Sequence, residues 1–386
     1  MKTVVSLFIG AAIITVILLG FAKFRQDTVF EKPARPTSPP LSAQKTPEQT
    51  APVTTVATGL EVPWAIAFLP EGGDMLVTER SGSVRLVRKS GGLDPNPLLT
   101  IEDVEEIGEG GLMGVAIHPD FPQKPYVYFY YTTGQRGSQT TNQLVRYTFE
   151  DGAFSDKIVL IEAIPGAPNH DGGRIKFGPD SFLYITTGDS QEPSLAQNRN
   201  SFAGKILRVT DEGKPAPGNP FISGGGNPLV YSYGHRNPQG ISWNSSGNLW
   251  ATEHGRSAPT GLDEINLIES GQNYGWPTIQ GDETRSGMVT PKRNSGPTTT
   301  WAPSGAAFVN NSLFFAGLRG ETLYEAAIKG DNVTQLKEHF KGQFGRLREV
   351  VLSPDGMLYV TTSNRDGRGS PSNEDDRIIK IDPNKL

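Results

Sequence analysis

A unit of apolar strand, polar turn and second apolar strand occurs six times along the chain, and no other feature limits the possible folds as strongly. Successive units start 44 to 65 residues apart, and their turns are rich in Pro, Gly, Asp and Asn. A sheet unit repeated at roughly this period, with about four strands per unit, is typical of a β-propeller. A β-sandwich does not require six matching hairpins. We therefore predict an all-β, six-bladed β-propeller with units that begin at residues 64, 112, 174, 239, 304 and 348.

A propeller must also protect the edges of its ring. The last unit shows only three strands of its own, so we expect the strand 53–57 to complete it beside 377–381. A third strand is predicted in five units, at 83–87, 143–148, 205–209, 264–267 and 377–381.

The third unit carries the most polar hairpin, Asn169–Asp189, with the sequence NHDGGRIKFGPDSFLYITTGD. His170 precedes its first strand and Asp189 follows its second. The two ends of a hairpin lie together, so these side chains are expected at one rim of the sheet.

Residues 1–25 contain the one long apolar run, MKTVVSLFIGAAIITVILLGFA, which is about as long as a membrane-spanning helix of roughly 20 residues. No small-residue cleavage site follows, so we predict a hydrophobic N-terminal helix that acts as an uncleaved membrane anchor, with a cleaved export signal as the alternative. Either would place the rest of the chain outside the cytoplasm, at the periplasmic or extracellular face. Residues 26–52 are rich in Pro, Ser and Thr and predict a disordered linker, and residues 53–386 form the propeller.

Composition excludes several classes of site. The 36 basic and 41 acidic residues give a net charge of −5, so no nucleic-acid surface is indicated. The chain has no cysteine, which excludes disulfides, thiolate zinc sites and thiol nucleophiles.

Further polar residues gather at predicted strand ends. His235 precedes one strand and His254 ends the next, so with His170 three of the five histidines are expected at one rim. Arg346 and Arg348 enter a late strand, where a side-chain period of two puts both on one face. That face could bind a polyanionic ligand through forked hydrogen bonds, or it could be a solvated or salt-bridged face.

Four segments together resemble one known family: GEGGLMGVAIHPDF, NHDGGRIKFGPD followed by TTGD, GHRNPQG, and DEINLIESGQNYGWP. From about residue 53 to its end, the chain resembles the soluble quinoprotein aldose sugar dehydrogenases, which use pyrroloquinoline quinone (PQQ). The resemblance implies a six-bladed propeller, PQQ and Ca²⁺ as cofactors, and oxidation of aldoses at C1 to lactones by hydride transfer to the quinone.

The resemblance also implies roles for individual residues. His170 would be the general base, Asp189 its partner acid and Arg236 a further catalytic residue. The family's Gln is replaced by Glu109, a second Gln by His254 and a Lys by Arg319. The implied cofactor-binding set is Glu109, His170, Arg236, Asn237, His254, Asp263, Thr300, Arg319, Arg346, Arg348 and Asn364.

Calcium in this family is held by two successive backbone carbonyls, which here would belong to Gly255 and Arg256, where the best-known members have Gly-Pro. Gln280 and Asp282 are candidates for a second calcium. The expected partners are an aldose substrate, an electron acceptor that the sequence does not identify, and the membrane through residues 1–25.

Two other classes stay open at this point. A six-bladed propeller could be a calcium-dependent lactonase, which needs a cage of carboxylate and amide ligands in its channel. It could also be a binding propeller without catalysis, because the fold alone does not determine function.

Overall fold

The computed structural model describes residues 53–70, 72–134, 139–256 and 261–386. The predicted N-terminal helix in 1–25 and the linker over 26–52 lie outside the described residues. No described helix is long and apolar enough to cross a membrane.

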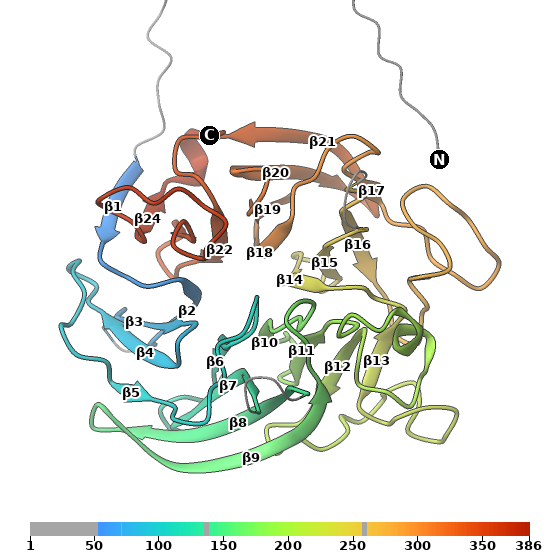
Figure 1. The fold of residues 1–386 in the computed structure, drawn as a ribbon, viewed down its shortest axis with the longest axis horizontal. Helices are drawn as coiled ribbons and strands as arrows, with labels where there is room; N and C mark the ends of the chain where they lie inside the picture. Colours follow the sequence, from blue (N-terminus) through green and yellow to red (C-terminus); the bar gives the residue numbers. More distant parts are fainter. Residues whose placement is uncertain (1–52, 71, 135–138, 257–260) are drawn as a thin grey trace, which may run out of the picture. The chain divides into compact units, whose positions relative to one another are not determined.

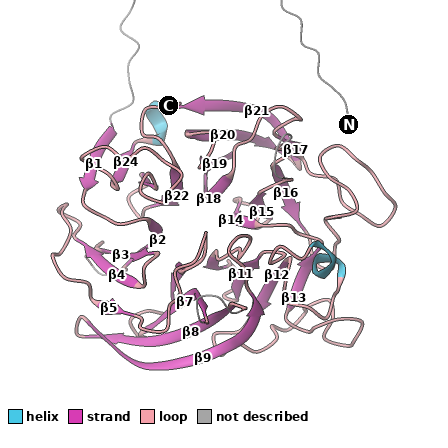
Figure 2. Ribbon diagram, in the orientation of Figure 1, coloured by secondary structure: helices cyan, strands magenta, loops and turns pink. Residues whose placement is uncertain are grey.

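The described chain forms six four-stranded antiparallel sheets arranged as a ring (Figures 1 and 2). In five of the sheets the strands follow chain order from the centre outward, because the chain connects strands that then pair as neighbours, and in the last sheet the first strand of the chain is added at the outer edge. The first three sheets contain β2 (Pro63–Phe68), β3 (Met75–Glu79), β4 (Ser83–Val87) and β5 (Leu99–Thr100); β6 (Leu112–Ile117), β7 (Tyr126–Thr133), β8 (Thr141–Glu150) and β9 (Ala153–Pro165); and β10 (Ile175–Phe177), β11 (Leu183–Thr187), β12 (Lys205–Val209) and β13 (Val230–Tyr233).

The next two sheets, and the last one, complete the ring. They contain β14 (Pro238–Trp243), β15 (Leu249–Glu253), β16 (Glu264–Ile268) and β17 (Arg293–Asn294); β18 (Pro303–Val309), β19 (Ser312–Gly317), β20 (Thr322–Lys329) and β21 (Asn332–His339); and β22 (Leu347–Leu352), β23 (Leu358–Thr362), β24 (Ile378–Ile381) and β1 (Val53–Ala57). Two short 3-10 helices, η1 (Pro193–Gln197) and η2 (Pro383–Lys385), are the helical segments of the described chain.

The last blade combines both ends of the propeller, as predicted. β1 pairs antiparallel with β24, and Val53 lies opposite Ile381. Figure 1 shows the blue first strand beside the red final strands. This pairing hides an edge of β24 that would otherwise expose unpaired backbone groups.

Buried side chains fill the space between neighbouring blades. Tyr128, Phe129, Tyr130 and Tyr131 on β7 are all buried, because a strand sandwiched between two blades has an apolar environment on both faces. The fully buried Trp64 on β2 belongs to the same hydrophobic cluster. Burial of one large apolar side chain contributes roughly 1.5–3 kcal/mol, so these layers supply much of the stability.

The innermost strands of the six blades surround a central channel with one cavity at each end. One cavity lies at the ends of these strands, near Phe68, Phe177 and Leu352, and has a volume of 410 Å³. The other lies where the same strands begin. The two cavities share no lining residue.

Candidate active site

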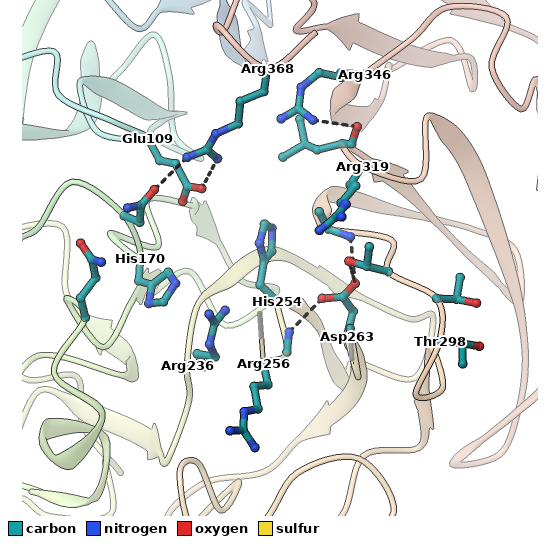
Figure 3. A pocket seen from close by; sticks show the side chains of 18 residues that line it. Glu109, His170, Arg236, His254, Arg256, Asp263, Thr298, Arg319, Arg346 and Arg368 are labelled. Atoms are coloured by element: carbon teal, nitrogen blue, oxygen red, sulfur yellow. Dashed lines mark hydrogen bonds and ion pairs between the residues drawn. The ribbon is translucent and has the colours of Figure 1, made fainter. Parts of the chain in front are cut away.

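The cavity at the beginning of the inner strands has a volume of 620 Å³ and a strongly polar wall (Figure 3). Its walls are formed by segments that directly precede β6, β10, β14, β18 and β22 and by loops that follow β11, β15, β19 and β23. Ten predicted site residues line it: Glu109, His170, Arg236, His254, Gly255, Arg256, Asp263, Thr300, Arg319 and Arg346.

His170 and Asp189 form a hydrogen-bonded pair at this cavity. The His170 Nδ1 lies 2.7 Å from Asp189 Oδ1, and Asp189 also accepts hydrogen bonds from the Trp276 indole at 2.8 Å and from the Gln191 backbone at 2.9 Å. A carboxylate bonded to Nδ1 favours the tautomer with its proton on that nitrogen. The Nε2 lone pair is then available to accept a proton.

The backbone around this pair is strained. His170, Ser190 and Gln191 have φ angles of 68°, 54° and 58°, a region that non-glycine residues rarely adopt. A Cβ atom on Gly188 would lie 1.8 Å from the His170 carbonyl oxygen, so only glycine fits beside the histidine. Strain of this kind persists where surrounding contacts hold it, and it is concentrated at functional sites.

Asn237 supports the same segment from behind the cavity. It is fully buried, and its Oδ1 accepts a hydrogen bond of 3.0 Å from the Gly172 backbone. Its Nδ2 has no partner among the described residues. Asn237 therefore fixes the backbone that follows His170 and does not line the cavity.

Glu109 is ion-paired with Arg368, a residue that the sequence did not single out. The Nη1 of Arg368 contacts Glu109 Oε1, and its Nη2 donates to Asn169 Oδ1 at 2.8 Å. Burial raises the pKa of Glu109, but His254, the bound guanidinium of Arg368 and His170 together lower it to about 2. The carboxylate is therefore ionised at neutral pH.

His254 lines the cavity as a neutral ring. Burial lowers the pKa of His254 to about 4, although the carboxylates of Asp263 and Glu109 oppose this shift. Its Nε2 has no hydrogen-bond partner among the described residues. A buried nitrogen without a partner is costly in an empty protein, so this one suits contact with a ligand.

Asp263 organises one wall of the cavity. Its carboxylate accepts hydrogen bonds from the backbone of Gly255 at 2.9 Å, the hydroxyl of Thr300 at 2.8 Å, and the backbones of Trp301 and Ala302 at 2.6 and 2.9 Å. These four bonds join the loop after β15 to the segment before β18, so Asp263 holds this wall of the cavity together.

The late arginines differ in how they face the cavity. Arg346 lines it and pairs with Asp366 at 2.8 Å. Arg348 contacts the same carboxylate at 3.8 Å and the Ser363 hydroxyl at 3.2 Å, so both guanidiniums lie on one face, as expected from their spacing. Arg348 is buried and does not line the cavity.

Asn364 contacts this group from the end of β23. Its Oδ1 accepts a hydrogen bond of 2.8 Å from the Arg346 backbone, and its Nδ2 donates to the Phe344 carbonyl oxygen at 2.9 Å. The Arg319 side chain makes no hydrogen bond or ion pair with the part of the chain that the structure describes. Arg236 is buried, and its guanidinium lies 5.4 Å from the centre of the Trp276 ring.

Three further predicted or suggested residues lie apart from the cavity wall. The Gln280 backbone donates to Glu283 at 3.1 Å, and Asp282 accepts from the Asn294 side chain at 2.7 Å. His235 is fully buried between Ser232 and Glu253, so it stands at the expected rim but not in the cavity. The described residues include no cluster of three or more His, Cys, Asp or Glu side chains that could hold a metal.

Sequence reasoning did not identify several lining residues. Asn169 and Gln191 lie within two positions of the predicted pair, so proximity to His170 and Asp189 was a signal for both. Arg368 gave no such signal, because it is 259 residues from Glu109 along the chain. The unassigned lining residues are Asn169, Gln191, Gly261, Thr298, Thr299, Ala302, Leu318 and Arg368.

Known proteins resemble this chain over most of its length. The family model described as "Glucose / Sorbosone dehydrogenase" matches residues 60–371. The aldose sugar dehydrogenase YliI of Escherichia coli is 34% identical over 349 residues, which cover 84% of this chain and 91% of the relative.

Solved structures show the same fold. The PQQ-bound aldose sugar dehydrogenase from Streptomyces coelicolor has a TM-score of 0.78 and 40% identity, and the match covers 86% of this chain and 98% of that one. A gluconolactonase from Xanthomonas campestris has a TM-score of 0.50 and 13% identity over 86% of this chain and 89% of that one, a likeness that shows the fold alone. The chain therefore belongs to the glucose/sorbosone dehydrogenase family.

Proposed function

We propose that this protein oxidises aldose sugars at C1 to lactones, with PQQ as hydride acceptor and Ca²⁺ as activator. Membership of the family makes the chain an oxidoreductase acting on sugar CH–OH groups. The observation that carries the finer proposal is the His170–Asp189 pair, whose free ring nitrogen belongs to a cavity with several arginines.

The residues present fit PQQ, a planar quinone with three carboxylates. Arg236, Arg319 and Arg346 would hold those carboxylates through charge-assisted hydrogen bonds. The unpartnered Nε2 of His254 gives a further polar contact at the same cavity. When bound, PQQ supplies the electrophilic carbonyl that accepts the hydride.

The fit to Ca²⁺ depends on oxygen atoms other than clustered carboxylates. Asp263 already accepts four hydrogen bonds, so the carbonyls of Gly255 and Arg256 are the proposed protein ligands. A calcium ion there would act as a Lewis acid. Gln280 and Asp282 remain proposed ligands of a second, separate ion.

His170 is the proposed general base. Its Nε2 would take the proton of the sugar C1 hydroxyl as the hydride leaves, a type of contribution worth roughly 10²–10⁴-fold in rate. Asp189 would keep Nδ1 protonated and stabilise the imidazolium that forms. The Trp276 and Gln191 hydrogen bonds hold the carboxylate in place for both roles.

The lactonase alternative has less support from the site. Its cage of carboxylate and amide ligands does not account for the several arginines at this cavity, and the described residues bring no three acids or histidines together as a metal site. A binding propeller without catalysis would not account for the strained backbone at His170 or for its hydrogen bond to Asp189.

A reconstitution assay tests the proposal. Purified protein is titrated with PQQ and CaCl₂, PQQ binding is followed by absorbance, and dye reduction is measured over a panel of aldoses. We expect sugar-dependent dye reduction that needs both additions and that falls after chelation of calcium. Lactone hydrolysis without dye reduction would favour the lactonase, and PQQ binding with neither reaction would favour a binding protein.

We also propose that residues 1–25 direct export and anchor the propeller at the membrane through the linker 26–52. The support is the apolar run followed by a Pro-rich stretch.

A further inference from the structure

Arg368 connects three blades at the edge of the active-site cavity (Figure 3). It follows β23 in the last blade and reaches Glu109, which precedes β6, and Asn169, which precedes β10. Half of its side chain, 51%, is exposed, so it lies at the mouth and not in the floor.

The loop that carries Arg368 is tied to the arginine proposed to hold the cofactor. The Arg368 backbone donates to Asp366 Oδ1 at 2.9 Å, and Asp366 Oδ2 pairs with Arg346 at 2.8 Å. A Cβ atom on Gly369 would lie 2.6 Å from the Asn364 carbonyl oxygen, so the loop folds back closely on the residue at its own start. The guanidinium therefore projects from a fixed base.

Glu109 needs this guanidinium because its carboxylate is largely buried. The side chain is 17% exposed, and the buried Oε2 has no hydrogen-bond partner among the described residues. The charged and titratable groups that influence it are Arg368, His254, His170 and, more weakly, the buried Asp171, Arg236 and Arg348. Arg368 is the one that contacts it directly.

The chemistry of this pair suits a sugar better than the cofactor. The carboxylate of Glu109 and the amide oxygen of Asn169 are acceptors, and sugar hydroxyls are donors. An anionic quinone would be repelled by Glu109. Both acceptors line the same cavity as His170, where the reacting hydroxyl must lie.

We propose that Arg368 is a positioning residue for the sugar: it holds Glu109 and Asn169 beside His170, so that their free acceptor sites bind the substrate hydroxyls. This inference rests on the proposed function of the cavity. It explains how a Glu is accommodated where the resemblance implies a Gln, because Arg368 balances the added charge.

The test is a double-mutant cycle with Arg368→Ala and Glu109→Gln in the PQQ- and Ca²⁺-loaded protein. The binding probe is 1,5-anhydroglucitol, which lacks the C1 hydroxyl and cannot be oxidised there, measured by calorimetry; KM and kcat are measured with an aldose. Arg368→Ala should raise both the Kd of the probe and KM about tenfold, the scale of a lost charged hydrogen bond, and should leave kcat within about threefold. PQQ affinity, measured by absorbance, should not change.

Coupling between the two residues decides the result. In the Glu109→Gln background, Arg368→Ala should have much less effect, because a neutral amide does not need the guanidinium. The control Arg365→Ala changes an exposed arginine of the same loop that does not line the cavity, and it should behave as wild type.

Three outcomes would overturn the inference: equal effects of Arg368→Ala in both backgrounds, an unchanged Kd and KM, or a loss confined to PQQ affinity. Failure of the wild-type protein to oxidise any aldose would instead remove the proposed function, and this inference with it. Normal wild-type oxidation with an unaffected Arg368→Ala variant would overturn this inference alone.

Discussion

The two ends of the central channel are formed by the same six strands, yet they treat polar groups differently. Beside the cavity near the strand ends, Arg174 pairs with Glu349 through Nη1 and donates from Nε to the Gln239 carbonyl oxygen at 2.9 Å. Lys176 donates to the Ala306 carbonyl oxygen at 2.8 Å. The side chains of Arg174 and Lys176 thus link the third blade to the fourth, fifth and sixth blades.

At the beginning of the strands, polar groups are directed into a cavity instead. Nitrogen or oxygen atoms of His254 and Glu109 lack partners there, and the backbone at His170 is strained. Side chains join blades at both ends, as Arg368 does with Glu109 and Asn169, so what distinguishes the second end is the strained backbone at His170 beside polar atoms that lack partners. Departures from complete pairing are expected where a protein functions.

The largest expected effect comes from removing the base at the available end. His170→Ala should lower kcat by about 10²-fold or more and leave PQQ affinity nearly unchanged, because the arginines remain. Single-turnover reduction of bound PQQ by an aldose measures this. His339→Ala is the control, since that histidine contacts Glu325 on the outer blade edge. Reduction at the wild-type rate in His170→Ala would place the base elsewhere, and His254 would be tested next.

The cross-linked end should respond in stability instead of rate. Glu349→Gln leaves the buried guanidinium of Arg174 without its carboxylate, and loss of one partner of a buried ion pair costs roughly 3–5 kcal/mol. Denaturant unfolding should show this loss, with the rate per folded molecule unchanged. The double variant Arg174→Met, Glu349→Leu should recover part of the stability, because no buried charge is left alone. An unchanged unfolding midpoint together with slower aldose oxidation by Glu349→Gln would show that this pair serves the reaction and not stability.

A smaller effect is expected from Asp171, the residue that follows the proposed base His170 in the sequence. Burial raises the pKa of Asp171 from 3.8 to about 7, although hydrogen bonds from Asn142 and Ala167 oppose the shift. A raised pKa means that the folded state favours the protonated acid. Its contribution to stability is complete below about pH 4 and is lost as pH rises through about 7.

Melting temperatures of wild type and Asp171→Asn should therefore diverge with pH. Asparagine cannot ionise, so the melting temperature of the variant should rise by a few degrees relative to that of the wild type as the pH goes from about 5 to about 8. A constant difference over that interval would show that Asp171 keeps one protonation state throughout.

The smallest effect is expected from deleting residues 1–52. The described lining residues of both cavities come from later in the chain, so the shortened protein should be folded and should oxidise aldoses at the rate of the full chain. Fractionation should find the full-length protein with membranes and the shortened one in solution. Full-length protein in the soluble fraction, with its N-terminus near residue 22, would favour a cleaved export signal.

Much of the fold could be predicted from sequence because local signals repeat. The six hairpins became the two innermost strands of each blade, and the five predicted third strands are present. The strand β20 was missed because Glu325, Ala326 and Ala327 favour helices, and pairing with β19 and β21 overrides that preference. The strands β5 and β17 have two residues each, too few to show a pattern.

The site was less predictable because its contacts join distant parts of the chain. His170 and Asp189 belong to one hairpin, so local reasoning was sufficient to place them together. The pairing of Arg368 with Glu109 and the shared carboxylate of Asp366 depend on ring closure. The spacing of Arg346 and Arg348 predicted a common face but not that Arg348 would be buried against Asp366.

The buried layer inside the channel has a kinetic consequence. Trp64 is fully buried, and its ring lies 4.2 Å from the Arg174 guanidinium carbon and 5.8 Å from that of Arg348. The cavities on either side of the ring share no lining residue among the described residues, so we expect the candidate active-site cavity to have one entrance. Under the proposed function, the sugar and the electron acceptor would have to use that entrance in turn, with product released before reoxidation. Double-reciprocal plots of rate against sugar concentration, at several acceptor concentrations, would then give parallel lines. An excess of either reactant would slow the reaction by competing with the binding of the other.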